Sequence, residues 1–176
     1  MTRHLTKALM LIAVLGVAAC NNPDRYANGT AGAGAGANAA TGISSSPLGD
    51  PNDPKSIAYF NQTVGDTVHF AEDQSTLAPE AQQILATQAT WLARNSDYGI
   101  IIEGHADERG TREYNLALGA RRASAVKEFL AAHGISATRM RTISYGKERP
   151  IALCSAPQCY AENRRAVTVL TQPGNS

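Results

Sequence analysis

The sequence lacks an excess of charge of either sign. Its 16 lysine and arginine residues nearly balance its 15 aspartate and glutamate residues, which gives a formal net charge of +1. Nucleic acids and anionic membrane surfaces attract chains with a strong positive excess. The charge balance therefore gives no reason to expect a nucleic-acid partner.

The sequence also lacks an apolar run long enough to cross a bilayer as a helix, which takes about 20 residues. The run from Ala8 to Ala19 is shorter and follows a basic start at residues 3–7, as in an export signal. It ends in Val17-Ala18-Ala19-Cys20. Small residues before a cysteine resemble the processing site of bacterial lipoproteins, which predicts a signal peptide at residues 1–19 and a lipidated Cys20 at the outer membrane. An ordinary signal peptide with an incidental cysteine is the alternative.

Cysteine is scarce, with three residues in the whole chain. Once Cys20 is assigned to lipidation, Cys154 and Cys159 remain, in the sequence CSAPQC. In an oxidising compartment outside the cytoplasm this pair predicts a small disulfide loop. Zinc is the alternative, but two further ligands at a familiar spacing are missing.

Bulky apolar residues are nearly absent between residues 21 and 54, which consist mainly of Gly, Ala, Asn, Ser and Pro. Such a composition cannot bury enough surface to offset the entropy of ordering the chain. We therefore predict a flexible tether at residues 20–54 and a single folded domain at residues 55–176.

Within that domain, helical and strand periodicities alternate. One helix is predicted from Pro79 to about Asn95, and a second from an N-cap at Thr111 to a stop at Gly134. Apolar runs predict four strands, at Thr67–Phe70, Gly99–Glu103, Met140–Ser144 and Arg165–Leu170. The predicted fold class is α+β, with a mixed four-stranded sheet covered on one face by two main helices.

The stretch EGHADERGTREYNLALGARR, residues 103–122, is the most densely charged part of the chain. It lacks the two histidines one helical turn apart that a zinc protease needs, and the chain lacks a Gly-x-Ser-x-Gly elbow. We therefore predict no metal site, and we expect His105 to be a hydrogen-bonded residue at a strand end. Glu103 and Asp107 remain a candidate carboxylate pair for glycan hydrolysis.

The same stretch, followed by ISYGKERP and AENRRAV, closely resembles the OmpA-like peptidoglycan-binding domain over residues 64–171. The resemblance implies a βαβαββ fold and a noncatalytic role without a cofactor. It also implies that the domain holds the diaminopimelate of the peptidoglycan stem peptide. The free end of diaminopimelate carries an ammonium and a carboxylate on one carbon. A carboxylate and a guanidinium suit that pair of charges, and the amides at a helix N-terminus add an anion site.

The resemblance also implies the site residues. The acidic ligand of the family matches Asp107, and its guanidinium ligand matches Arg122. The remaining matches are a turn with ligand-facing N–H groups (Gly110, Thr111), a pocket-lining loop (Phe70, Asp73), a pocket wall (Leu118) and a structural amide (Asn115). Ala71 stands where the family often has aspartate. We expect the other charged residues of the stretch to be solvated surface charge, with a surface for a partner as the alternative, namely Glu108, Arg109, Arg112, Glu113 and Arg121.

For a lipid-anchored member of this family, the resemblance implies a partnership with the periplasmic protein TolB and with other Tol proteins. It further implies a role in envelope integrity and in outer-membrane constriction at cell division. TolB is expected to compete with the wall for the same surface. The alternative from a different class is a lipid-anchored peptidoglycan hydrolase of the periplasm.

Overall fold

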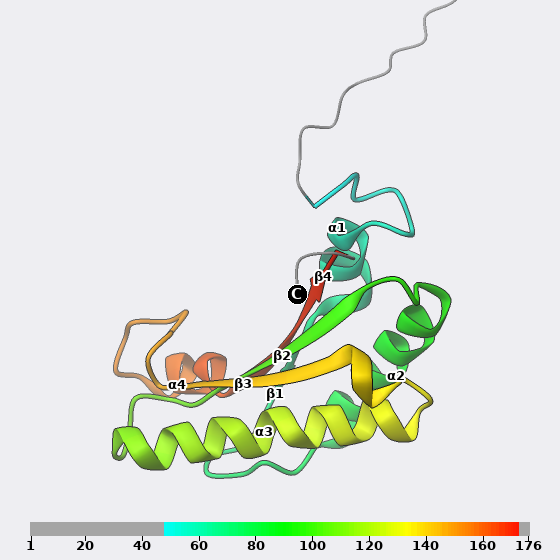
Figure 1. Cartoon of the computed structure of the whole chain (residues 1–176). Helices are drawn as coiled ribbons and strands as arrows, with labels where there is room; N and C mark the ends of the chain where they lie inside the picture. Colours follow the sequence, from blue (N-terminus) through cyan, green and yellow to red (C-terminus); the bar gives the residue numbers. More distant parts are fainter. Residues whose placement is uncertain (1–47, 173–176) are drawn as a thin grey trace, which may run out of the picture. The chain divides into compact units, whose positions relative to one another are not determined.

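The computed structural model describes residues 48–172 (Figure 1). The predicted signal peptide, the lipidated Cys20 and the tether up to residue 47 lie outside the described residues. In chain order the elements are α1 (Ile57–Tyr59), the π-helix η2 (Phe60–Gly65), β1 (Thr67–His69), α2 (Pro79–Arg94), β2 (Gly99–His105), α3 (Arg112–Ala132), the 3₁₀-helix η3 (Ala137–Arg139), β3 (Met140–Gly146), α4 (Pro157–Asn163) and β4 (Arg165–Thr171).

The four strands form one mixed sheet in the order β1-β4-β2-β3. β2 and β3 are parallel and are joined by α3, while β4 runs antiparallel to both β1 and β2. Figure 1 shows α3 running along the sheet, where it packs on β2 and β3, and α2 contacts β1 and α3. The predicted α+β fold with its mixed four-stranded sheet is confirmed.

The core lies between these two helices and the sheet. Alternate residues of β2 and β4 are buried, including Ile100 and Ile102 on β2. Leu85 and Leu92 of α2 and Leu130 of α3 are fully buried in the same cluster. Burying a side chain of this size contributes about 1.5–3 kcal/mol. This layer fixes the position of α3 relative to the end of β2.

Two consecutive hydrogen bonds of buried side chains connect α2 to the sheet. Thr168 of β4 donates a hydrogen bond to the side-chain carbonyl of Gln88 (2.9 Å), and the Gln88 amide donates to the carbonyl of Gly65 (2.7 Å). Thr168 and Gln88 are both buried, so each needs such a partner.

Two glycines set the closest approach of α3 to the sheet. A Cβ atom placed on Gly104 of β2 would lie 1.9 Å from the carbonyl oxygen of Gly119 in α3. A Cβ atom on Gly119 would lie 2.7 Å from the carbonyl oxygen of Gly104. The helix and the strand therefore meet backbone to backbone, which only glycine at both positions permits.

The structure differs from the sequence-based expectation mainly in short elements. β2 and β3 each extend two residues beyond the predicted ends, to His105 and Gly146, and β1 stops at His69, one residue short of its predicted end. The short helices α1, η2 and α4 were not predicted. Each has seven residues or fewer, too few for a helical period to show.

Residues 48–54, which fall within the predicted tether, make hydrogen bonds to the domain. The indole N–H of Trp91 donates to the carbonyl of Pro54 (2.8 Å), and the Ser56 hydroxyl donates to the carbonyl of Asp50 (2.6 Å). The N–H of Ala58 donates to the carbonyl of Leu48 (2.9 Å).

Two further features concern the remaining predictions. Cys154 and Cys159 form a disulfide between the loop after β3 and α4, with Cα atoms 5.8 Å apart. Among residues 48–172, no helix combines the length and the apolar character that a bilayer span requires.

Candidate functional site

A pocket of about 280 Å³ opens where β2 ends and the chain turns into α3. Its lining carries charges of both signs in a small volume. The lining residues are Glu72, Asp73, Asp107, Arg109, Gly110, Tyr114, Asn115, Leu118 and Arg122. Six of them are residues that the sequence analysis assigned to ligand binding: Asp73, Asp107, Gly110, Asn115, Leu118 and Arg122.

The turn between β2 and α3 is built by capping interactions. The Thr111 hydroxyl accepts a hydrogen bond from the N–H of Tyr114 (3.2 Å), so Thr111 is the N-cap of α3, as predicted. Gly110 has a φ of +83°, a left-handed backbone conformation that residues other than glycine rarely adopt. The buried Asn115 amide donates to the carbonyl of Arg109 (2.6 Å) and holds the turn against the helix.

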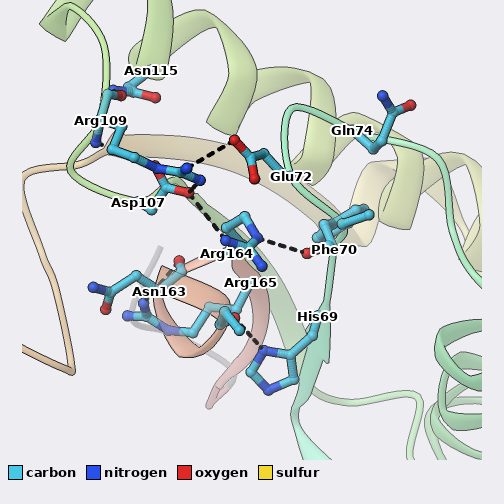
Figure 2. Close-up of polar contacts among 12 residues, drawn as sticks. His69, Phe70, Glu72, Gln74, Asp107, Arg109, Asn115, Asn163, Arg164 and Arg165 are labelled. Atoms are coloured by element: carbon cyan, nitrogen blue, oxygen red, sulfur yellow. Dashed lines mark hydrogen bonds and ion pairs between the residues drawn. The ribbon is translucent and has the colours of Figure 1, made fainter. Parts of the chain in front are cut away.

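Asp107 is almost completely buried at the floor of the pocket, and cationic groups surround it. One carboxylate oxygen accepts from the backbone N–H (3.2 Å) and the Nε (3.3 Å) of Arg109. The other accepts from Nη2 of Arg109 (2.9 Å) and from Nη1 of Arg164 (3.3 Å) (Figure 2). Burial by itself would raise the pKa of Asp107, but the hydrogen bonds from both arginines outweigh it and hold that pKa below its usual value.

Arg109 lies over Asp107 and bridges it to a second acid. Its Nη1 is 2.8 Å from a carboxylate oxygen of Glu72, and its guanidinium lies 4.7 Å from the centre of the Tyr160 ring. Figure 2 shows the guanidinium between the two carboxylates. The hydrogen bond to Asp107 raises the pKa of Arg109, and the hydrogen bond to Glu72 raises it further. Arg109 is exposed, as expected of a surface charge, but Glu72 and Tyr160, far away in sequence, also bring it into the lining of the pocket.

Arg122 lines the pocket and is fully buried. Its Nε donates to the carbonyl of Gln74 (2.8 Å), Nη1 to that of His105 (2.7 Å) and Nη2 to that of Ala71 (3.1 Å). Burial lowers the pKa of Arg122 to about 10, against the opposing effect of Asp107, so it remains charged at neutral pH. Arg122 therefore joins the loop at residues 71–74 to the end of β2 while it places a positive charge at the pocket.

The loop after β1 supplies the opposite wall. Asp73 has a φ of +56° and accepts a hydrogen bond from the hydroxyl of Tyr114, and this bond raises the pKa of Tyr114. Phe70 does not line the pocket but packs behind Arg122, with its ring centre 5.2 Å from the guanidinium carbon. Thr111 also lies outside the lining and acts as the helix cap.

His105 is buried at the end of β2, but the expected hydrogen bond is absent. Neither ring nitrogen has a hydrogen-bond partner among the described residues, and Nε2 lies 3.7 Å from a carboxylate oxygen of Glu103. Burial, with smaller effects of Arg165 and Arg149, lowers the pKa of His105 to about 4. The expectation was wrong because the imidazole packs against the Tyr145 ring, 5.5 Å between centres, and neither ring nitrogen comes within hydrogen-bond distance of a partner among the described residues.

Four residues of the site were not assigned to it from the sequence: Glu72, Arg109, Tyr114 and Arg164. One signal was available for Arg164. It is the first of two adjacent arginines at the start of an apolar strand, and neighbouring residues of an extended chain point to opposite faces of a sheet. In the structure Arg164 reaches Asp107, while Arg165 donates to the carbonyl of Arg149.

The chemistry of the pocket favours binding over hydrolysis. A glycosidase needs a carboxylic acid with a raised pKa as its proton donor. The pKa of Asp107 is lowered, and Glu103 does not line the pocket. Within residues 48–172, no group of three or more His, Cys, Asp and Glu side chains is placed to hold a metal ion.

Comparison with known proteins shows which protein family the chain resembles. A family model described as the OmpA family matches residues 69–164. The peptidoglycan-associated lipoprotein of Brucella melitensis is 50% identical over 167 residues, which cover 95% of this chain and 92% of the relative. That of Rhizobium meliloti is 48% identical over 167 residues, with 95% and 88% covered. The crystal structure of the peptidoglycan-associated lipoprotein from Burkholderia pseudomallei superposes with a TM-score of 0.61 at 39% identity, over 72% of this chain and 100% of that chain.

Proposed function

This chain belongs to the OmpA family, and on that premise we propose that it is an outer-membrane lipoprotein that binds peptidoglycan noncovalently. The ligand is the diaminopimelate of the stem peptide. The relatives that match over most of the chain carry the name peptidoglycan-associated lipoprotein, which supports this ligand class and this location. The protein acts by binding without turnover.

The observation that carries the proposal is the mixed charge of the pocket. The free end of diaminopimelate is a zwitterion, so it needs an anion and a cation within a few ångströms. The pocket provides both, in the carboxylate of Asp107 and the guanidinium of Arg122. In this proposal Asp107 takes the ammonium, and the positive charge of Arg122 attracts the carboxylate. Asp73, Gly110 and Leu118 shape the space between them, while Phe70, Thr111 and Asn115 hold the loops in place.

The anchor and the tether complete the proposal. A lipidated Cys20 followed by a tether that ends before residue 48 holds the pocket at a distance from the outer membrane, in the periplasm. Two or three acyl chains anchor a protein stably where a single chain does not. Because the wall repeats its ligand many times, a weak single contact is strengthened by a high effective concentration.

The resemblance to the OmpA-like domain extends the proposal to the Tol-Pal system. In that system the protein takes TolB and other Tol proteins as partners, and it serves envelope integrity and membrane constriction at division. TolB competes with peptidoglycan for the end of the sheet that carries the pocket. Purified TolB should therefore release the protein from sedimented peptidoglycan.

The proposed ligand contact is tested by co-sedimentation of the full chain, in mild detergent, with purified peptidoglycan. Asp107→Asn keeps the shape of the side chain but removes the charge that bonds the ammonium. A hydrogen bond to a charged group contributes about 1.5–3 kcal/mol, so we expect the affinity to fall by about tenfold or more. Glu108→Gln removes the neighbouring exposed carboxylate and should bind as the wild type does.

Arg122 is not suited to the same test. Its replacement would leave three backbone carbonyls without their donor, and the loss of binding would then reflect a damaged fold. Equal sedimentation of folded Asp107→Asn and wild-type protein would rule out the assigned ligand contact. Release of soluble muropeptides by the wild type would support the hydrolase alternative instead.

A further inference from the structure

The described domain begins with a loop whose two ends lie together. The carbonyl of Leu48 accepts a hydrogen bond from the N–H of Ala58 (2.9 Å), and the Ser56 hydroxyl donates to the carbonyl of Asp50 (2.6 Å). Residues 48–56, which we call the entry loop, therefore begin beside α1 and return to it. A loop that is closed in this way holds chain length that spans almost no distance.

The entry loop lies on the surface of the domain. Residues 48–55 are exposed or half-exposed, whereas the chain is buried from Ser56 onward. Ile57 is 9% exposed and Phe60 is fully buried, and both belong to the core. Detachment of the entry loop would therefore uncover far less apolar surface than opening of the core, and it would stop where α1 enters the core.

Two side chains of the domain hold the end of the entry loop. The indole N–H of Trp91 donates to the carbonyl of Pro54 (2.8 Å), and the hydroxyl of Tyr98 donates to the carbonyl of Lys55 (2.9 Å). Because the bonded residues follow one another along the chain, a pull on residue 48 reaches their hydrogen bonds one after another. The sheet and the core, by contrast, have to open together, so the loop should open first.

The entry loop and the pocket lie at opposite ends of β2. Tyr98, which holds the loop, directly precedes this strand, and Asp107 of the pocket follows it. The seven residues of β2 span about 23 Å. Figure 1 shows the entry loop (cyan) beside α1 and away from the start of α3. A load between an anchor at Cys20 and a ligand in the pocket therefore passes through the entry loop.

We infer that the entry loop is an extensible part of the link between the outer membrane and the wall. When the two are pulled apart, the loop detaches from Trp91 and Tyr98 and straightens, while the core and the pocket stay folded. Its nine residues then add about 30 Å of reach. The loop closes again when the load falls. This inference rests on the proposed function and deepens it, because it describes how the same link responds to tension.

The test pulls single molecules of the chain from Cys20 to its C-terminus in optical tweezers. One handle is attached to the unlipidated Cys20, and the other to the cysteine of Glu108→Cys, an exposed position next to the pocket, with the disulfide left oxidised. We expect a reversible step of about 30 Å at a lower force than the larger step in which the domain unfolds.

A second pulling geometry is the control. The handles are attached through Gln62→Cys, at an exposed position of η2, and Glu108→Cys, in a chain that also carries Cys20→Ser. The entry loop then lies outside the load path. We expect the larger step alone.

A conservative variant tests whether the observed hydrogen bonds close the loop. Tyr98→Phe removes the hydroxyl that bonds Lys55 and keeps the ring that stacks on Trp91, with 5.6 Å between ring centres. At constant force, the ratio of open to closed loop should rise about fivefold, the effect of one neutral hydrogen bond. Tyr145→Phe makes the same change near the end of β3 and should leave the ratio unchanged.

The inference would be overturned if the early step were absent with a handle on Cys20, or if it persisted with a handle at Gln62. Equal ratios in Tyr98→Phe and the wild type would overturn it as well. These outcomes leave the proposed function standing, because co-sedimentation measures peptidoglycan binding separately. Failure of the wild type to sediment with peptidoglycan would overturn the proposed function, and the role of the loop in the link with it.

Discussion

At the scale of single residues, His105 links the pocket to the stability of the fold. Its side chain is 2% exposed, and its backbone carbonyl accepts a hydrogen bond from Arg122. Its imidazole packs on Tyr145 and lies near the cationic side chains of Arg165 and Arg149. These surroundings favour the neutral imidazole, so protonation and folding oppose each other.

We therefore expect the free energy of unfolding to decrease as the pH falls from about 6.5 to about 4. The pKa of His105 is about 4 in the folded state and about 6.5 in an unfolded chain, so between these values the unfolded state binds more protons. The contribution of the neutral imidazole is complete above pH 6.5 and is lost as the pH falls toward 4, by an amount on the order of 3 kcal/mol. Urea unfolding at pH 7.5 and 4.5 measures this loss.

His105→Phe, which keeps an aromatic ring against Tyr145, should show a smaller loss of stability over this window. His133→Gln, at an exposed position, should behave as the wild type does. The pKa of Asp107 is lowered, so its contribution is lost only below the range of ordinary carboxyl groups and does not confuse the comparison. Equal pH dependence in His105→Phe and the wild type would contradict the prediction.

Single residues also show which parts of the site can be predicted from a sequence motif and which cannot. Asp107 and Asn115 could be assigned from the stretch at residues 103–122, because their neighbours in sequence are also their neighbours in the pocket. Arg109 belongs to the same stretch, yet its position depends on Glu72 and Tyr160, tens of residues away on other elements. No local pattern records that proximity, so its role became visible only in the fold.

At the scale of elements, the end of α2 is completed by a residue from another part of the chain. The last carbonyls of a helix have no partner within the helix. Arg139, at the end of η3, donates to the carbonyls of Leu92 (3.2 Å) and Asn95 (3.0 Å), and also to that of Tyr98 (3.1 Å). One side chain thus fastens the end of α2 and the approach to β2.

Arg139→Ala should destabilise the domain by about 2 kcal/mol, since it removes three charged hydrogen bonds from half-buried carbonyls. Urea unfolding monitored by circular dichroism measures the change. Arg141→Ala, on the exposed surface of β3, is the matched control and should stay within about 0.5 kcal/mol of the wild type. A similar result for both variants would show that Arg139 is not the cap that we describe.

The elements themselves were predictable in proportion to their length. α2 and α3 have 16 and 21 residues, and their starts at Pro79 and after Thr111 follow from Pro at the first position and from an N-cap. η2 and α4 have six and seven residues and are fixed by what they pack against, as when Asn163 of α4 accepts from the N–H of Ile151 (2.9 Å). Such tertiary contacts leave no period in the sequence.

At the scale of the whole molecule, the described domain begins before its first helix. Trp91 is the only tryptophan of the chain and is 7% exposed, and its indole N–H is bonded to the carbonyl of Pro54. Residues 48–54 thus contribute to the burial of a core aromatic residue, together with the bond between Ser56 and Asp50. The stability of the domain should depend on this segment.

A chain that starts at residue 55 should be less stable than one that starts at residue 48 by about 2 kcal/mol. The shorter chain leaves a buried indole N–H without its acceptor and uncovers part of the ring. Urea unfolding gives the difference, and a shift of the Trp91 emission to longer wavelength in the folded shorter chain would locate it. Identical stability and emission of the two chains would contradict the prediction.

The contact between Gly104 and Gly119 has a consequence for the pocket. Asp107 follows β2, whereas Asn115, Leu118 and Arg122 come from α3, so the spacing of these two elements determines the width of the cavity between them. That spacing is set by the meeting of two bare backbones, with no side chain in between. The width of the pocket and its charge are therefore set by different residues. Substitution of the acids and arginines of the pocket can change which ligand it binds. The size of the ligand that fits is set by Gly104 and Gly119, which do not line the pocket.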